Sequence, residues 1–196
     1  SISSDGVDIH YEVHGEGEPT LVFIHGWSCD RSYWQAQVDY FAKKYQVITI
    51  DLAGHGESGT NRSEWNLRDY GTDVVSVVNA LQLEKLVLVG HSLGGHVALE
   101  AASLMQEKVL MVIGADSLHD LSATFSEEEM MALSQAMETD FRATAEDMVR
   151  SQMFLPEADI SLVEAVASDI GSAPPAIAID TLRGYDRWTK KKRGET

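Results

Sequence analysis

The sequence has few of the residues that mark disulfide-rich, nucleic-acid-binding or membrane proteins. Its single cysteine, Cys29, excludes an internal disulfide. Only 15 lysines and arginines face 31 aspartates and glutamates, which gives a formal net charge of -16. So acidic a surface repels polyanions, and nucleic acid is therefore not an expected partner. No apolar run approaches the ~20 residues of a membrane-spanning helix, so no membrane span is expected.

The residues that are present predict a soluble globular protein. The chain has 196 residues and a hydrophobic fraction of 44%, enough for a domain with a real core. No glycine-rich phosphate loop and no metal-ligand spacing occurs, so neither a cofactor nor a metal is expected. No secretory signal opens the sequence, which begins at Ser1. The location stays unknown, with the cytoplasm and export after removal of a leader both open.

Short apolar runs alternate with helix-like segments in the first half of the chain. The runs 21–24, 47–50, 86–89 and 109–113 are nearly continuous in apolar residues, as in strands buried on both faces. The segment 9–13 alternates instead, which favours an antiparallel edge strand. Stripes at helical spacing lie between the runs. The pattern predicts an α/β fold with a mostly parallel sheet flanked by helices.

The pattern changes after Leu118, where no strand-like run follows. Ser126 and Glu129 fit a capping box that opens one helix, and 144–147 fits the start of a second. Two further helical patterns follow, the last after Pro174 and Pro175. We therefore expect an α/β core over residues 1–118 and a helical cap over residues 119–196.

A serine follows the third of the four apolar runs. Gly90 and Gly94 flank Ser92 at G-x-S-x-G spacing. That spacing lets the chain turn sharply from strand to helix and hold the hydroxyl exposed at the tip. Only small side chains tolerate the close backbone approach of such a turn. The pattern predicts that Ser92 is a nucleophile.

Four motifs in this order resemble the α/β-hydrolase superfamily, in particular its serine esterase-like branch. They are residues 21–27 (LVFIHGW), 51–58 (DLAGHGES) and 90–95 (GHSLGG), and the strand that ends at Asp116. The resemblance implies acyl transfer on Ser92, with the backbone N–H groups of Trp27 and Leu93 as the oxyanion hole. It also implies that the Trp27 side chain walls the acyl pocket.

The resemblance gives roles to the histidines of these motifs as well. His25 and His55 would brace loops, and His91 would point away from Ser92. His96, one helical turn after Ser92, is expected to pack or to bond locally.

The chain departs from the family pattern in its last part. The order of the triad in this fold is serine, then acid, then histidine. The strands that usually carry the acid and the histidine are not visible, so the hydrolase fold is expected to be incomplete at its C-terminal side. Asp116 is the candidate acid and His119 the candidate base, with His96 the other histidine after Ser92.

Three explanations of this departure stay open. The chain is a fragment of a longer hydrolase, whose exposed apolar sheet edge would favour dimerisation or aggregation. Alternatively, a second chain or a swapped copy covers that edge and completes the site. In the third, the chain is a non-catalytic small-molecule binding module on a hydrolase fold.

These observations predict a serine hydrolase that acts on carboxylic esters or related acyl substrates through an acyl-enzyme on Ser92. The partner would be a small ester-like molecule, and this truncated chain by itself could be inactive. The alternatives are the binding module, or a cofactor-free perhydrolase or C–C bond hydrolase on the same residues. The identity of the substrate has no code in the sequence.

Overall fold

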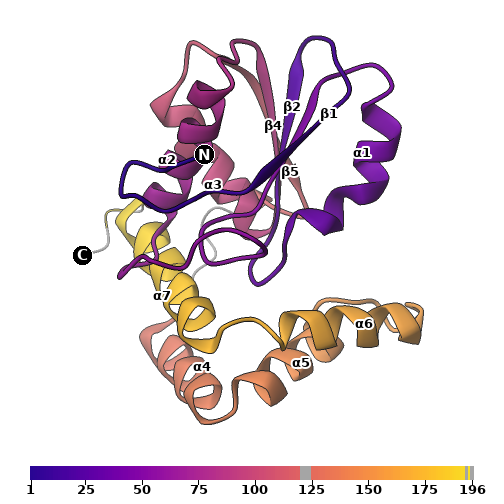
Figure 1. Cartoon of the computed structure of the whole chain (residues 1–196). Helices are drawn as coiled ribbons and strands as arrows, with labels where there is room; N and C mark the ends of the chain where they lie inside the picture. Colours follow the sequence, from indigo (N-terminus) through magenta and orange to yellow (C-terminus); the bar gives the residue numbers. More distant parts are fainter. Residues whose placement is uncertain (120–124, 193, 195–196) are drawn as a thin grey trace.

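The computed structural model describes residues 1–119, 125–192 and 194 (Figure 1). Within these residues, five strands form one sheet in the order β1-β3-β2-β4-β5. β1 is antiparallel to β3, and the other neighbouring pairs are parallel. The predicted mostly parallel sheet with an antiparallel edge strand is confirmed. The strands are β1 Tyr11–His14, β2 Thr20–Ile24, β3 Val47–Ile50, β4 Leu86–His91 and β5 Val109–Ala115.

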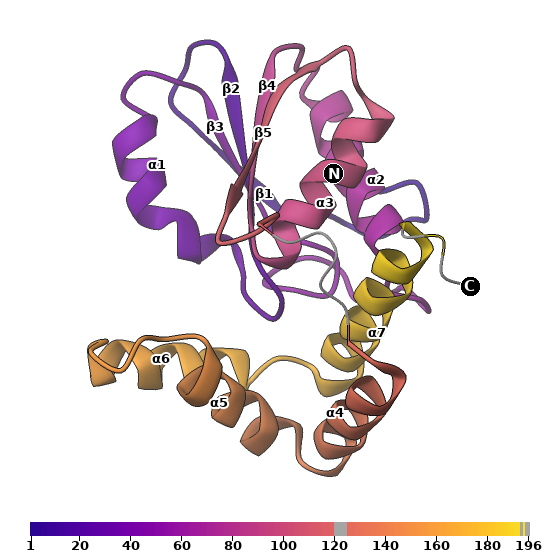
Figure 2. The same ribbon diagram turned by 180° about the vertical axis from the view of Figure 1, so that it is seen from behind.

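Helices cover the sheet unequally. α2 and α3 lie together on one face, and α1 lies on the other face (Figures 1 and 2). α4 to α7 lie below the carboxyl ends of the parallel strands, as seen in Figure 1. The helices of the described residues are η1 Arg31–Trp34, α1 Gln35–Phe41, α2 Leu67–Ala80, α3 Leu93–Leu104, α4 Glu127–Thr139, α5 Phe141–Gln152, α6 Ile160–Ile170 and α7 Pro175–Lys192.

The main core lies between the sheet and the pair α2 and α3. Val22, Leu88, Val77 and Val97 are completely buried there, from strands β2 and β4 and from helices α2 and α3. Burial of each such side chain stabilises the fold by about 1.5–3 kcal/mol relative to an exposed one. This apolar contact fixes α3, and with it the turn that precedes α3, against the centre of the sheet.

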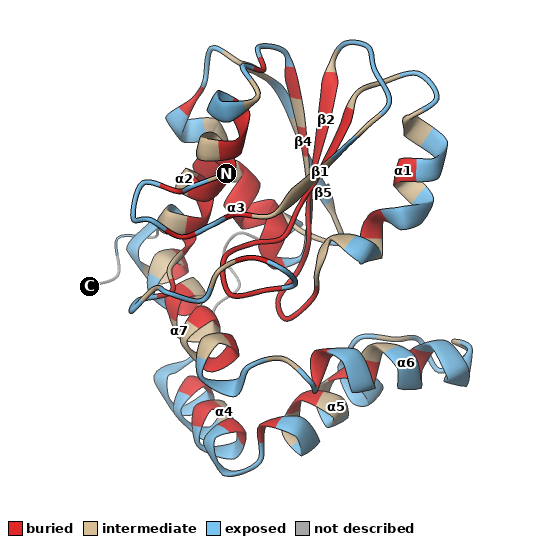
Figure 3. Cartoon of the chain, viewed as in Figure 1, coloured by how far each residue is buried: buried red, intermediate tan, exposed pale blue. Residues whose placement is uncertain are grey.

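Strand β5 differs from its prediction as a strand buried on both faces. Leu110, Met111 and Ile113 expose 62%, 56% and 42% of their surface. The reason is that β5 is the last strand of the sheet and pairs only with β4 within the described residues. Most of α3, by contrast, is buried (Figure 3). A groove of about 450 Å³ also lies beside α1. Val87 and Val89 of β4 line it together with their β5 neighbours Met111 and Ile113.

The helical segment α4–α7 confirms one predicted helix start and corrects another. At α4, Ser126 and Glu129 form the predicted capping box, with hydrogen bonds of 3.2 and 2.8 Å. The predicted start at 144–147 is wrong, because α5 begins at Phe141. Asp140 both ends α4 and caps α5, accepting a hydrogen bond from the Ala143 N–H at 3.0 Å.

Two of these helices bear on the question of a membrane span. No single helix of the described residues is long and apolar enough to cross a membrane. α6 and α7 meet that condition only as a pair bent by 95°.

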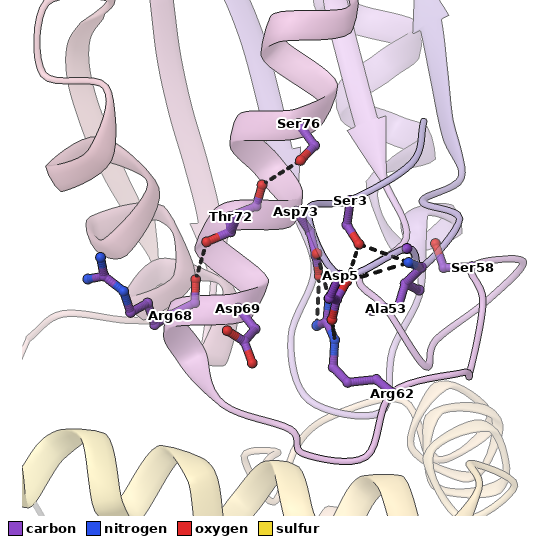
Figure 4. A network of polar contacts seen from close by, with 12 residues as sticks. Ser3, Asp5, Ala53, Ser58, Arg62, Arg68, Asp69, Thr72, Asp73 and Ser76 are labelled. Atoms are coloured by element: carbon purple, nitrogen blue, oxygen red, sulfur yellow. Dashed lines mark hydrogen bonds and ion pairs between the residues drawn. The ribbon is translucent and has the colours of Figure 1, made fainter.

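A largely buried ion-pair network joins the N-terminal segment to the middle of α2 (Figure 4). The Arg62 guanidinium donates to both carboxylate oxygens of Asp73, at 2.7 and 3.0 Å, and to Asp5 at 2.7 Å. The hydrogen bond from Arg62 lowers the pKa of Asp5 to about 2. Burial dominates at Asp73 and raises the pKa of its carboxyl to about 6 despite the arginine. The network therefore holds the loop before α2 in place, although burial of the Arg62 and Asp73 charges costs free energy of desolvation.

Candidate active site

Ser92 stands at the junction between β4, which ends at His91, and α3, which begins at Leu93. Its backbone has φ 50° and ψ -119°, a conformation that non-glycine residues rarely adopt, and the residue is exposed. Such strain costs of order 1–3 kcal/mol and persists only where the surroundings enforce it. The predicted strand-to-helix turn with an exposed serine at its tip is present.

The flanking glycines are required by close backbone contacts. A Cβ on Gly90 would lie 2.2 Å from the carbonyl oxygen of Gly94. A Cβ on Gly94 would lie 2.3 Å from the carbonyl oxygen of Ile24, on the neighbouring strand β2. The two glycines of the G-x-S-x-G spacing therefore allow the first turn of α3 to pack directly against β4 and β2, while Ser92 stays exposed.

Two further contacts hold the backbone of Ser92. Its N–H donates to the Ala115 carbonyl at 3.2 Å, and its carbonyl accepts from the Ser117 hydroxyl at 2.6 Å. Asp116 and Leu118 adopt φ 44° and 66°, so the turn after β5 is strained as well. The two strained turns are thus bonded to each other at the carboxyl ends of adjacent strands.

The backbone N–H groups of Trp27 and Leu93 lie in the two segments that the resemblance indicates. Trp27 follows β2, and Leu93 is the first residue of α3, where the helix dipole favours negative charge. Within the described residues, neither N–H donates to a turn, loop or cap acceptor.

A cavity of about 240 Å³ opens beside Ser92 and brings the predicted site residues together. The core provides the turns after β2, β4 and β5, and α7 provides side chains that the sequence did not single out. The described lining residues are Trp27, Ser92, Leu93, His96, Asp116, Ser117, Leu118, His119, Phe125, Leu182 and Tyr185.

The predicted acid and base share this cavity with Ser92 but are not connected to it. Asp116 and His119 are both exposed. Among the described residues, no hydrogen bond joins the Ser92 hydroxyl to either side chain, or to His96. The structure therefore places a serine, a carboxylate and a histidine at one opening without a formed triad.

His96 is expected to pack or to bond locally, and it does both, with α7 as a packing partner that the sequence did not indicate. Its Nδ1 lies 3.4 Å from the Ser92 carbonyl oxygen, and its ring meets the rings of Tyr185 and Trp188 edge-on at 4.9 and 5.5 Å. Burial lowers the pKa of His96, so the ring is neutral at pH 7. The aromatic residues of α7 carry no sequence signal beyond their apolar character, and sequence analysis missed them.

His25 braces two loops at the site. Its Nε2 accepts a hydrogen bond from the Leu52 N–H at 2.9 Å, so Nδ1 carries the proton and donates to the Gly26 carbonyl at 2.8 Å. Burial lowers the pKa of His25 to about 3. His55 bonds the Ala53 carbonyl in the second of these loops at 3.0 Å. The predicted bracing roles of His25 and His55 are confirmed.

His91 lines a different cavity from the one beside Ser92. A Cβ on Gly26 would come within 2.9 Å of the His91 Nδ1, and His91 shares its cavity with Trp34. Ser92 is not among the residues of that cavity, in agreement with the prediction that His91 points away from it.

An open α/β sheet with a strained serine between strand and helix, facing a helical segment, defines the class of the α/β hydrolases. The sequence model of the alpha/beta hydrolase fold matches residues 19–155. The chain belongs to this family.

Individual relatives match parts of the chain. An (E)-2-((N-methylformamido)methylene)succinate hydrolase of Acinetobacter baylyi is 40% identical over 85 residues, which are 43% of this chain and 32% of that protein. The karrikin insensitive 2 receptor IA of Petunia hybrida is 27% identical over 188 residues, 89% of this chain and 67% of that protein.

Solved structures share the fold over most of the chain. An esterase from Exiguobacterium antarcticum superposes with a TM-score of 0.81 at 20% identity, covering 93% of this chain and 70% of that one. This chain thus spans about a third of the first curated relative and about 70% of the esterase. Both shares agree with an incomplete hydrolase fold.

Proposed function

We propose that this hydrolase acts on carboxylic esters or related acyl substrates through an acyl-enzyme on Ser92. The observation that carries the proposal is the strained, exposed Ser92 beside a cavity, with Gly90 and Gly94 in contacts that no side chain tolerates. Ser92 combines this strain, at φ 50° and ψ -119°, with exposure at the cavity and a place between strand and helix. A nucleophile that must reach a carbonyl carbon accounts for this combination.

In the proposed reaction, the Ser92 oxygen attacks the carbonyl carbon of the ester and its proton leaves to a base. The resulting oxyanion accepts hydrogen bonds from the N–H groups of Trp27 and Leu93, each worth about 3 kcal/mol in comparable sites. The alcohol departs with a proton, and the acyl group stays on Ser92. Water then attacks the acyl-enzyme, which releases the carboxylic acid and restores the hydroxyl.

The base and the acid of this reaction have two candidate sources. The first is Asp116 and His119, which share the cavity with Ser92 and lie on or next to the strained turn after β5. The other source is a polypeptide that covers the unpaired edge of β5 and the groove beside it, from further chain or from a second copy. The exposed Met111 and Ile113 support such a cover, because exposed apolar strand edges favour pairing.

One alternative function is a non-catalytic small-molecule binding module. It is favoured by the absence, within the described residues, of any hydrogen bond from a histidine to the Ser92 hydroxyl. A relative named as a receptor is 27% identical to this chain over 188 residues. A cofactor-free perhydrolase or a C–C bond hydrolase would use the same serine and the same N–H groups.

The proposal is tested with p-nitrophenyl acetate and intact-mass spectrometry. We expect release of p-nitrophenol together with a mass gain of one acetyl group on the protein. Ser92→Ala should abolish that gain. Ser103→Ala, on the same helix α3, is the matched control and should keep it. An acetyl group that persists in Ser92→Ala contradicts the assignment of the nucleophile. A folded protein that neither gains an acetyl group nor releases p-nitrophenol favours the binding module.

A further inference from the structure

Leu182 of α7 lines the candidate active-site cavity together with Ser92. We propose that the cavity selects short, uncharged acyl groups and that Leu182 sets the limit of their length. The inference rests on the proposed role of Ser92 as the nucleophile and names the substrate class for that role.

The volume of the cavity limits the size of the acyl group. Pockets that bury drug-sized ligands have volumes of roughly 300–1,000 Å³. This cavity has about 240 Å³, which lies below that range. An acyl chain of four or five carbons fits this space together with the reacting carbonyl, whereas a chain of ten carbons does not.

The charges around the cavity disfavour an anionic acyl group. Its described lining residues include no lysine and no arginine, and the carboxylate of Asp116 lies among them. Buried His96 is neutral at pH 7 and supplies no positive charge. A substrate carboxylate would therefore lose hydration without gaining a cationic partner, and it would face Asp116.

Hydrogen bonds before and after Leu182 hold α7 in place, and two of them precede it. The Trp27 Nε1 donates to the Ala178 carbonyl at 2.8 Å, and the Tyr70 hydroxyl bonds the Thr181 hydroxyl at 2.8 Å. Ala178 and Thr181 are both buried.

A third contact anchors the far half of the helix. The Trp188 Nε1 donates to the buried carboxylate of Glu100 at 2.7 Å. These contacts join α7 to the loop after β2 and to α2 and α3, and they restrain α7, with Leu182 on it, against moving away from the cavity.

The experiment uses fluorophosphonates with one reactive group and different alkyl groups. Ser92 forms an O–P bond, the P–F bond breaks, and fluoride leaves with the serine proton. The alkyl group takes the place of the acyl chain. We compare n-butyl, n-decyl and 4-carboxybutyl probes by the rate of labelling of the full chain, followed by intact mass. Leu182→Ala tests the wall, and Leu162→Ala, at an exposed leucine of α6, is the matched control.

We expect the butyl probe to label at least ten times faster than the decyl and the carboxybutyl probes. Leu182→Ala should raise the decyl rate about tenfold and leave the carboxybutyl rate low, and Leu162→Ala should change neither. Equal rates for the three probes, or a decyl rate unaffected by Leu182→Ala, overturn the inference while Ser92 stays the nucleophile. Absence of labelling by all probes on folded protein overturns the proposed function and the inference with it.

Discussion

The indole Nε1 of Trp27 donates a hydrogen bond of 2.8 Å to the carbonyl oxygen of Ala178, 151 residues further along the chain. The bond joins the loop after β2, which carries one proposed oxyanion donor, to the first part of α7. The ring of Trp27 also meets Phe141 of α5 edge-on at 6.1 Å. One side chain thus links the core to two helices that follow it.

Trp27→Phe should loosen α7 without unfolding the core. The variant keeps an aromatic ring but removes the hydrogen bond to the Ala178 carbonyl, at a cost of about 0.5–1.5 kcal/mol. We expect faster amide hydrogen exchange in α7 and a lower unfolding midpoint in urea. Tyr40→Phe, at an exposed aromatic residue of α1, is the control. If Trp27→Phe exchanges no faster in α7 than this control, the bond does not hold the helix.

Arg62→Met should be strongly destabilising. It leaves the completely buried Asp73 without its partner, and loss of one member of a buried pair costs about 3–5 kcal/mol. The double variant Arg62→Met with Asp73→Leu should recover much of that loss. Urea unfolding at pH 7.5 measures both. Arg142→Met removes an exposed pair with Glu146 and should change stability by under about 1 kcal/mol. A similar loss for the two arginine variants contradicts the account.

Acid should destabilise the fold through His25. The ring is neutral in the folded state, with its pKa lowered to about 3 by burial, while the unfolded chain binds a proton near pH 6.5. The unfolded state therefore binds more protons between these values, and stability is lost as the pH falls below about 6.5. The slope reaches about 1.4 kcal/mol per pH unit for one such histidine.

His25→Gln isolates the contribution of the His25 proton, because glutamine has a carbonyl oxygen acceptor and an NH₂ donor but does not titrate. We expect the free energy of unfolding of the variant to fall less steeply than that of the wild type between pH 6.5 and 4.5. The raised pKa of Asp73 acts in the opposite direction in this range, so the difference between variant and wild type is the quantity to compare. His14→Gln on β1 is the control. Parallel curves for wild type and His25→Gln contradict a neutral, buried His25.

His119→Ala should leave the acylation of Ser92 unchanged within about twofold. No hydrogen bond of the described residues connects the two side chains, and general-base catalysis typically contributes 10²–10⁴-fold. The rate of acetylation by p-nitrophenyl acetate, followed by intact mass, tests this expectation. A loss of 100-fold or more assigns the base to His119 and makes a polypeptide over the β5 edge unnecessary for the chemistry.

Much of the fold could be predicted because its signals are local. Apolar runs marked the strands of the sheet, and the glycines around Ser92 marked the turn that the structure shows. The sequence did not show that β5 is exposed. The residues of β5 are as apolar as those of the central strands, so composition alone does not distinguish this edge strand from a buried one. The start of α5 was misplaced because Asp140 belongs to two helices at once.

The wall of the candidate cavity could not be predicted for a different reason. Leu182 and Tyr185 line the same cavity as Ser92 because contacts between distant segments, such as the bond between Glu100 and Trp188, hold α7 there. Nothing in the local pattern of α7 distinguishes a helix that faces a cavity from one that only packs on α3.

The central claim is that the fold makes Ser92 a nucleophile, and peptide mapping after fluorophosphonate treatment tests it most directly. Folded protein and protein unfolded in urea are treated alike, digested and analysed by tandem mass spectrometry, with Ser92→Ala in parallel. The account predicts a single adduct on Ser92 in the folded wild type, with none in the unfolded protein or in the variant. An adduct on another residue, or equal labelling of folded and unfolded chains, would contradict it.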